Sequence, residues 1–265
     1  MVVSTNERLI AHVEGAVGWL IFNNPRSRNS VTVDMWEAIP GVIANFDRDP
    51  AIRVIVLRGC DTQAFASGAD ISEFEKQFSS PTAIDRYNAL VDDALYGLGA
   101  VRKPTIAMIH GYCIGGGLAI ALACDMRIAA RTARLGIPAA RLGLSYSWRG
   151  IQTLMQIVGP AYTKEIMMTA RYLSAEEAHT MGLVNQVVAE SELEEDVRSH
   201  CVQIANNAPL AIEAIKGIVA ELVKSAADVD HERCERLIAG CFQSRDYIEG
   251  RRAFLEKRKP IFTGS

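Results

Sequence analysis

The sequence predicts an α/β fold followed by a helical C-terminal part. Short apolar runs rich in β-branched residues recur through the first half of the chain, and segments with helical spacing separate them. Strands that alternate with helices favour a mostly parallel sheet covered by helices. After about residue 148 the pattern is helical almost to the end. We therefore expect an α/β core at residues 1–200 and a helical region at residues 201–265, with no linker or repeat.

The strands are predicted from four apolar runs bounded by turn residues, at 17–22, 53–58, 105–109 and 126–130. Helical spacing over 33–47 follows Thr32, a candidate N-cap, and we expect Pro40 to bend or split that helix. The most apolar segment, 114–124, is too short to cross a bilayer and predicts a buried core helix.

The last third of the sequence carries helix signals. Ser174 and Glu177 have the spacing of a capping box, which opens a short helix. Two amphipathic segments follow at 191–206 and 209–225. A basic C-terminal helix is expected to end at 256–260.

The composition argues against several classes of function. The chain has 265 residues, of which 49% are hydrophobic and 22% charged, as in a globular protein with a sizeable core. A net charge of −3 without a long basic run argues against nucleic acid as a partner. The first 15 residues do not resemble a signal peptide, six scattered cysteines predict reduced thiols, and five dispersed histidines argue against a metal site. We expect a cytoplasmic protein that does not bind membranes.

Two loops could carry chemistry. Residues 64–71 read AFASGADI, where small residues let the backbone approach a ligand and the amide of Ala69 could donate to an oxyanion. Residues 111–117 end in Gly115, Gly116 and Gly117 at a predicted strand-to-helix junction, where free amides and a helix N-terminus suit developing negative charge. Neither loop has the pattern of a P-loop or of a dinucleotide-binding turn.

Taken together, the motifs AFASGADI, HGYCIGGGLAIALACD, ARLGIP, GLVNQVV and FLEKRKPIF resemble the enoyl-CoA hydratase/isomerase (crotonase) family, from about residue 10 to the end. The resemblance implies a crotonase-like superhelix (spiral) of ββα turns and a helical C-terminal trimerisation region, hence a homotrimer or hexamer. It also implies an acyl-CoA substrate of fatty acid metabolism, with coenzyme A as part of the substrate and no covalently bound cofactor. Its oxyanion hole consists of two backbone amides, which by motif fall at Ala69 and Gly116.

The resemblance also implies contacts with coenzyme A. Matched by motif, these are Arg26, Ser27, Arg28, Ser67, Ala69, Asp70, Ile71 and Lys257. Ser67 matches a position near the adenine, and Lys257 matches a basic residue near the phosphates. For Lys257 the alternative is a solvated helix face, and for Asp70 it is capping of the next turn.

The sequence departs from the hydratases of the family at two positions. The first hydratase glutamate follows the GGG by two residues, where this chain has Ala119, and the second follows the proline of a G-x-P-E motif, where it has Ala139. An alanine methyl cannot exchange a proton. We therefore expect weak or absent crotonyl-CoA hydration, and the single-glutamate isomerase route is also in doubt.

The loop that follows contains candidates for a replacement acid or base. They are Tyr146, Ser145 and Ser147. Arg141 or Arg149 could bind a substrate carboxylate, and Trp148 could form a wall of the acyl pocket. The alternative is that these arginines form surface ion pairs and the aromatic residues belong to the core. A substitute base could also come from Glu73, Glu75 or Asp85. His110, which precedes Gly111, could be only a hydrogen-bonded strand end.

Two classes of function remain open. One is an acyl-CoA enzyme of lyase type with a non-standard acid or base, acting by decarboxylation, thioester hydrolysis, retro-Claisen cleavage or an unusual hydration. The other is a non-catalytic acyl-CoA-binding paralogue. The intact oxyanion motifs favour the first, whereas the two alanines favour the second.

Overall fold

The computed structural model describes residues 7–73, 77 and 79–265. Within them, the larger sheet has the order β1-β2-β3-β5-β7-β10. Its strands are β1 (Leu9–Glu14), β2 (Val17–Phe22), β3 (Val54–Gly59), β5 (Thr105–Ile109), β7 (Met126–Ala130) and β10 (Gln186–Val188). Only the first pair is antiparallel, and the other neighbours are parallel. The predicted, mostly parallel sheet is confirmed.

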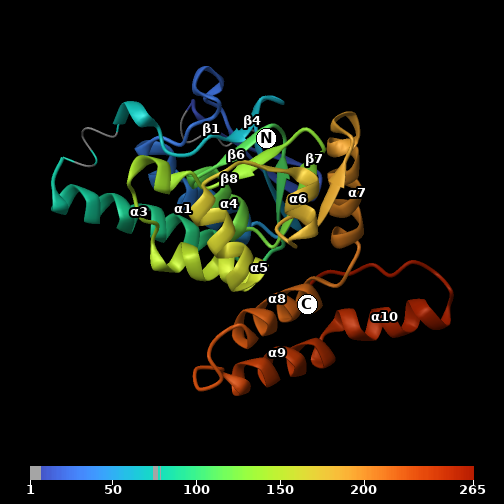
Figure 1. Cartoon of the computed structure of the whole chain (residues 1–265). Coiled ribbons are helices and arrows are strands. Elements are labelled where there is room, and N and C mark those ends of the chain that lie inside the picture. Colours follow the sequence, from blue (N-terminus) through green and yellow to red (C-terminus); the bar gives the residue numbers. More distant parts are fainter. Residues whose placement is uncertain (1–6, 74–76, 78) are drawn as a thin grey trace.

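A smaller sheet lies beside the first, in the order β4-β6-β8-β9. Its strands are β4 (Ala64–Ala66), β6 (Tyr112–Ile114), β8 (Arg134–Gly136) and β9 (Leu173–Ser174). The chain passes three times from the larger sheet to the smaller one, from β3 to β4, from β5 to β6 and from β7 to β8. Helices separate these pairs, so the core winds as the expected superhelix of ββα turns (Figure 1).

The passage from β5 to β6 requires a glycine. Gly111 has a φ of +51°, and a Cβ atom there would lie 1.9 Å from the carbonyl oxygen of Gln63. Only a residue without a side chain allows this approach of two backbones.

The helices lie mostly on one face of the larger sheet and beyond the core. They are α1 (Val33–Arg48), α3 (Pro81–Ala100), α4 (Gly116–Ala123), α5 (Trp148–Thr169), α6 (Ala175–Thr180), α7 (Leu193–Ala205), α8 (Pro209–Leu222), α9 (His231–Gln243) and α10 (Arg245–Leu255). Short 3₁₀ turns are η1 (Pro25–Ser27), η2 (Ile71–Glu73), η3 (Ala139–Leu142) and η4 (Glu190–Glu192).

The larger sheet has a hydrophobic cluster on each face. Ile55 and Leu57 of β3 belong to the cluster that α1, α3, α4 and α5 share, whereas Val54 and Val56 belong to the cluster on the opposite face. This alternation is the two-residue period of a strand.

Helix α7 covers the second cluster through Leu193, Val197 and Cys201. The predicted boundary between residues 200 and 201 falls within α7. The chain leaves the core only after Ala205, where α7 ends.

The structure bears on two local predictions about α1. Pro40 lies inside α1 without splitting it, and the buried face of α1, which includes Met35 and Ile39, packs on the core on both sides of the proline. Thr32 is the N-cap residue, as predicted, although it makes no side-chain capping bond and its hydroxyl donates to Asp34. The capping box of Ser174 and Glu177 is also confirmed.

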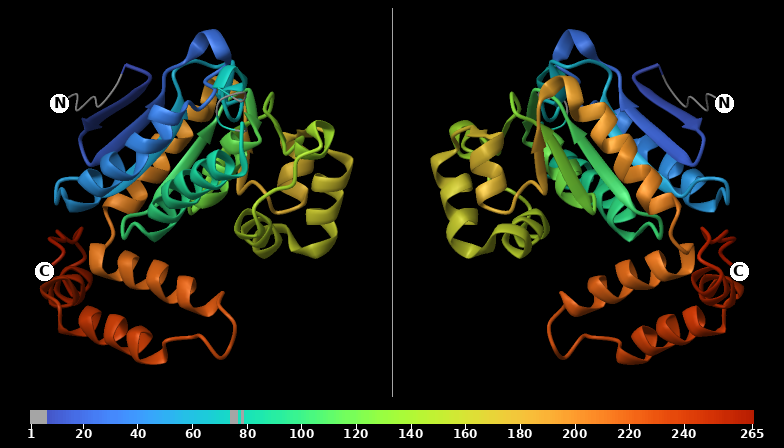
Figure 2. Two further views of the ribbon diagram at one scale, coloured as in Figure 1. Left: turned by 90° about the vertical axis from the view of Figure 1, so that its left-hand side faces the viewer. Right: turned by 90° about the vertical axis from the view of Figure 1, so that its right-hand side faces the viewer.

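Helices α8, α9 and α10 extend away from the core (Figures 1 and 2). An ion pair of 2.7 Å between Lys216 of α8 and Asp125 tethers them to it. All six cysteines are free thiols, and four of them are buried. No helix in the described part of the chain combines the length and the apolar character needed to span a membrane.

Candidate active site

The glycine-rich junction between β6 and α4 packs directly on β4. A Cβ atom on Gly117 would lie 2.1 Å from the carbonyl oxygen of Ala66. Gly115, with a φ of +55°, turns the chain from the strand into the helix. The first turn of α4 is therefore held against the end of β4, from which Ser67, Gly68 and Ala69 follow.

This packing brings the amides of Ala69 and Gly116 together. The Cβ position of Gly116 lies 3.6 Å from the amide nitrogen of Ala69, and the Cβ position of Gly68 lies 3.6 Å from the amide nitrogen of Gly116. Among the described residues, neither amide donates to a backbone carbonyl. Two adjacent free donors at the start of a helix can stabilise an oxyanion.

The loop at residues 24–29 lies beside the same strand. The amide of Ser67 donates to the carbonyl of Arg28 at 3.1 Å, and its hydroxyl donates to the carbonyl of Ser27 at 3.0 Å. Asn29 is fully buried and donates to the carbonyl of Ala64 at 2.7 Å. Arg26, Ser27 and Arg28 are exposed, and the guanidinium of Arg28 lies 5.0 Å from the centre of the Tyr112 ring. The expected CoA loop thus presents two arginines next to Ser67.

Asp70 has a structural role. Its carboxylate accepts hydrogen bonds from the amide and the hydroxyl of Ser72 and from the hydroxyl of Ser30. Burial opposes its ionisation, but these hydrogen bonds outweigh burial and hold the pKa of Asp70 below its usual value. Asp70 therefore caps the turn that Ile71 begins, and the side chain of Ile71 lies outside the described part of the structure.

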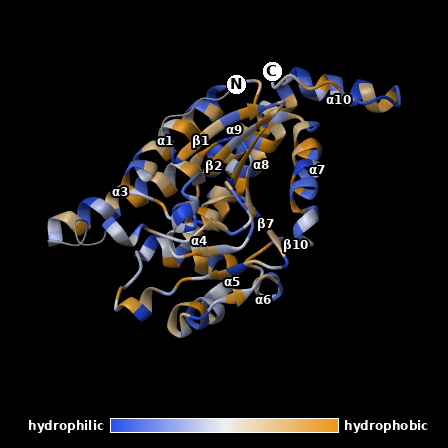
Figure 3. Cartoon of the chain, turned by 90° about the horizontal axis from the view of Figure 1, so that it is seen from above, coloured by the Kyte–Doolittle hydropathy of each residue, from blue (hydrophilic) through white to orange (hydrophobic). Residues whose placement is uncertain are grey.

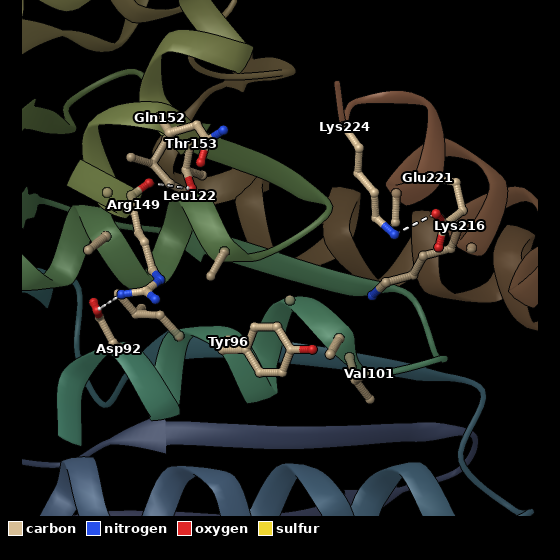
Figure 4. A pocket seen from close by; sticks show the side chains of 18 of the residues that line it. Asp92, Tyr96, Val101, Leu122, Arg149, Gln152, Thr153, Lys216, Glu221 and Lys224 are labelled. Carbon is tan, nitrogen blue, oxygen red and sulfur yellow. Dashed lines mark hydrogen bonds and ion pairs between the residues drawn. The ribbon is translucent and has the colours of Figure 1, made fainter. Parts of the chain in front are cut away.

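A cavity of about 620 Å³ lies between α3, α4, α5 and the pair α8–α9. Ala119 of α4 and Tyr146 are on its wall, so it adjoins the glycine junction. Figure 4 shows Asp92, Tyr96 and Arg149 on one side of it and Lys216 and Glu221 on the other. A cavity of this size accommodates a small-molecule group.

Tyr146 is the one loop candidate whose side chain reaches the glycine junction. Its hydroxyl donates to the carbonyl of Gly115 at 3.2 Å. Burial raises the pKa of Tyr146 far above its usual value, so the phenol is neutral at physiological pH. Ala139, the first residue of η3, is half-buried and packs against the core together with Tyr146.

The neighbours of Tyr146 have other partners. Ser147 is the N-cap of α5 and accepts from the amide of Gly150 at 3.1 Å. Arg149 pairs with Asp92 at 3.0 Å and lies 4.6 Å from the centre of the Trp148 ring. Trp148 lines the cavity but is 65% exposed.

Comparison with known proteins identifies the family. The sequence profile named enoyl-CoA hydratase/isomerase matches residues 12–265. The chain belongs to this family. It is 33% identical over 256 residues to the crotonyl-CoA hydratase of Syntrophomonas wolfei, covering 97% of this chain and 98% of the relative. It is 32% identical to the short-chain-enoyl-CoA hydratase of Clostridium acetobutylicum, with 95% of each chain covered.

A solved structure of the enoyl-CoA hydratase/isomerase family from Hyphomonas neptunium superimposes with a TM-score of 0.93 at 34% identity, covering 97% of this chain and 98% of that one. The fold is therefore the crotonase fold, as the sequence predicts.

Within this family fold, several predicted site residues lie apart from the glycine junction. Figures 1 and 2 place α10 at the far end of the molecule from β4. Lys257 follows α10, which ends at Leu255. Arg141 is exposed and lies over the ring of Tyr172, and Asp85 is exposed on α3. His110 is buried, which lowers its pKa, and its carbonyl accepts from the amide of Phe65.

Of the predicted acidic residues, Glu73 accepts from the amide of Val33 at 2.9 Å. Glu75 lies outside the described residues.

Two residues near the junction were not predicted from the sequence. The Cζ2 atom of Trp36, on α1, lies 3.3 Å from the Cβ position of Gly116. Tyr87, on α3, packs against the same core, and burial raises the pKa of Tyr87 to about 12, with a smaller contribution from the charge of Glu73. No motif marks either residue, because helices α1 and α3 reach the site only through tertiary packing.

Proposed function

We propose that this chain binds an acyl-CoA thioester and stabilises its enolate in an oxyanion hole formed by the amides of Ala69 and Gly116. The proximity of these two unengaged amides is the observation that carries the proposal. A thioester enolate concentrates negative charge on one oxygen, and two fixed donors suit that charge better than water does. The relatives named as enoyl-CoA hydratases act on substrates of this class by their names, which supports the same substrate for this chain.

The proton chemistry in this proposal differs from ordinary hydration. Ala119 and Ala139 stand where the resemblance places the hydratase glutamates, and neither can transfer a proton. Tyr146 remains as a neutral donor next to the junction. The reaction is therefore of lyase type with a non-standard acid or base, and crotonyl-CoA hydration is weak or absent.

The nucleotide end of coenzyme A would lie along the loop of Arg26, Ser27 and Arg28 beside Ser67. Lys257 follows α10, which lies far from this loop, so it cannot contact a CoA molecule bound to the loop of the same chain. Its contact with the CoA phosphates therefore comes from a neighbouring copy. This agrees with a homotrimer or hexamer.

The C-terminal helices support that assembly. Large apolar side chains along them are exposed: Ile215, Val219, Leu222, Val223, Ile238, Phe242, Tyr247, Ile248, Phe254, Leu255 and Ile261. Figure 3 shows apolar positions along α10, which lies apart from the core. Exposed apolar surface of this extent marks a protein–protein interface.

A second candidate is a non-catalytic acyl-CoA-binding protein. The two alanines favour it, because the oxyanion hole and the CoA loop would persist without an acid or base. Thioester hydrolysis and decarboxylation are reactions that the first candidate, the acyl-CoA enzyme, could catalyse.

A panel of acyl-CoAs tests the proposal. Calorimetry should show binding in the micromolar range, roughly −7 to −8 kcal/mol. Mass spectrometry of the same mixtures should reveal a product from at least one acyl-CoA. Binding without any product supports the second candidate, and no binding of any acyl-CoA at millimolar concentration contradicts both.

A further inference from the structure

The cavity between α3, α4, α5 and the pair α8–α9 connects the glycine junction with the C-terminal helices. On the core side Ala119 and Tyr146 line it, and the hydroxyl of Tyr146 donates to the carbonyl of Gly115 in that junction. On the other side it is lined by Lys216 of α8 and by Lys224, which follows this helix. An acyl group whose thioester lies at the junction would therefore extend toward these two lysines.

Basic side chains outnumber acidic ones around the cavity. Asp92 pairs with Arg149 at 3.0 Å, and Glu213 lies 3.9 Å from Arg102. The third acidic residue, Glu221, is shared by Lys224 and Arg233, which leaves no acidic residue of the lining for Lys216. In the described part of the chain, the charged lining residues are Arg102, Arg149, Lys216, Lys224 and Arg233 against Asp92, Glu213 and Glu221.

The ammonium group of Lys216 has hydrogen-bonding capacity left. It donates to the carboxylate of Asp125 at 2.7 Å and to the carbonyl of Lys103 at 3.0 Å, and an ammonium group has three hydrogens. Asp125 does not line the cavity, and it also accepts from the amide and the hydroxyl of Thr105. The side chain of Lys216 is only 14% exposed, so its charge is weakly screened by water and attracts an anion in the cavity.

Lys224 adds a second ammonium group on the same side. Its ion pair with Glu221 uses one of its three hydrogens. The carboxylate of Glu221 is buried and also accepts from Arg233, so two cations share one negative charge. Figure 4 shows Lys216 and Lys224 reaching into the cavity from the α8 side, with Tyr96 of α3 across from them.

We propose that Lys216 and Lys224 bind a carboxylate at the far end of the acyl group, so that the substrate is the CoA thioester of a dicarboxylic acid. This inference rests on the proposed function and names the substrate class for it. Leu95 and Leu122 also line the cavity and suit the methylene chain between the two ends. Ala119 suits the same class, because a glutamate there would repel an anionic acyl group.

Three pairs of CoA thioesters, matched in chain length, test the inference: succinyl with butyryl, glutaryl with pentanoyl, and adipoyl with hexanoyl. Calorimetry on the full-length protein should show that at least one dicarboxylic thioester binds roughly tenfold more tightly than its monocarboxylic match. The free dicarboxylic acid should bind far more weakly than its thioester. Equal affinity of the two would reveal a separate anion site and overturn the inference.

Charge removal at the two lysines identifies the residues. Lys224→Gln should reduce the preference for the dicarboxylic thioester about threefold or more, while the affinity for the monocarboxylic match stays about the same. Lys216→Gln should do likewise, although it also removes the ion pair with Asp125. If it does not fold, Lys224→Gln alone decides the question. Lys164→Gln is the matched control, because Lys164 is exposed on α5 and does not line the cavity.

The outcomes separate this inference from the proposed function. Equal binding within all three pairs by the wild type overturns the inference and leaves acyl-CoA binding intact. Equal losses for both members of a pair in Lys224→Gln and Lys216→Gln show a merely structural role and also overturn it. If none of the six thioesters binds, both proposals fail.

Discussion

The amide nitrogen of Ala69 lies 3.6 Å from the Cβ position of Gly116, although 46 residues separate the two in the sequence. One amide follows a strand of the smaller sheet, and the other begins a helix. Their proximity depends on the absence of a side chain at Gly117, where α4 meets β4.

The Gly116 amide can be removed by a substitution that a helix tolerates. Gly116 is the first residue of α4, where proline fits a helix and lacks the N–H. Gly116→Pro should lower turnover of the acyl-CoA substrate about 100- to 1,000-fold, as the loss of one oxyanion donor does elsewhere. Gly116→Ala keeps the amide, and its Cβ atom contacts the Trp36 ring as the Cβ atom of proline would, so it is the control. Equal activity of the two variants in a steady-state assay would argue against an oxyanion role for this amide.

Gly117 should be required for stability. In Gly117→Ala the new Cβ would lie 2.1 Å from the carbonyl oxygen of Ala66, so the backbone must shift. We expect a loss of about 1–3 kcal/mol in the free energy of unfolding. Gly41→Ala is the matched control, because Gly41 lies in α1 with no atom within 4 Å of its Cβ position. It should stabilise by about 0.5–1 kcal/mol. Urea unfolding measures both, and equal stability of the two variants would contradict the packing argument.

Hydration of crotonyl-CoA should be negligible. One general acid or base typically contributes roughly 100- to 10,000-fold, and alanines occupy both expected positions. The double change Ala119→Glu with Ala139→Glu should restore some hydration if the cavity has hydratase geometry. The apolar surroundings would raise the pKa of the new carboxylates and limit the gain. A spectrophotometric assay checks this, and wild-type turnover near about 10 per second would refute it.

The exposed apolar side chains of α8–α10 predict self-association, and the family resemblance implies that light scattering will show a homotrimer or hexamer. Leu255→Asp, at a side chain that is 78% exposed on α10, should shift the protein toward monomer. It should also weaken acyl-CoA binding, because Lys257 of a neighbouring copy would be lost from the site. Met168→Asp adds the same charge at a residue of α5 that is 74% exposed and should change neither property. A monomeric wild type at micromolar concentration would be incompatible with the prediction.

Glu221 should make the C-terminal helices sensitive to acid. A hydrogen bond from Lys224 is the main cause that lowers the pKa of Glu221 from 4.5 to about 2, and the Asp230 amide and Arg233 contribute. Because the folded pKa lies below the unfolded value, this stabilisation is complete above about pH 4.5 and is lost as the pH falls toward 2.

Glu221→Gln should therefore lower the melting temperature at pH 7 and approach the wild type near pH 2. Glu232→Gln, at a side chain that is 92% exposed, is the control and should follow the wild type throughout. Melting curves from pH 2 to 7 measure the effect. Parallel curves for wild type and Glu221→Gln would show that the Glu221 carboxylate does not contribute to stability.

Most of the secondary structure could be predicted because its signals are local. The apolar runs of β2, β5 and β7 and the capping box of Ser174 and Glu177 lie within a few residues. Other features depend on distant partners. Pro40 does not split α1, because burial of that helix against the core outweighs one lost hydrogen bond. The predicted boundary near residue 200 falls inside α7, which packs on the sheet.

The sequence by itself determined the family, the alternation of strands and helices, and the two loops that carry Ala69 and Gly116. It also determined that alanines occupy positions 119 and 139. Only the tertiary structure decided that Trp36 lies near Gly116, that Ser147 caps a helix, and that α10 lies far from β4. The physical reason is that backbone donors and contacts between distant helices leave no pattern in the sequence, since they arise from packing that joins segments far apart along the chain.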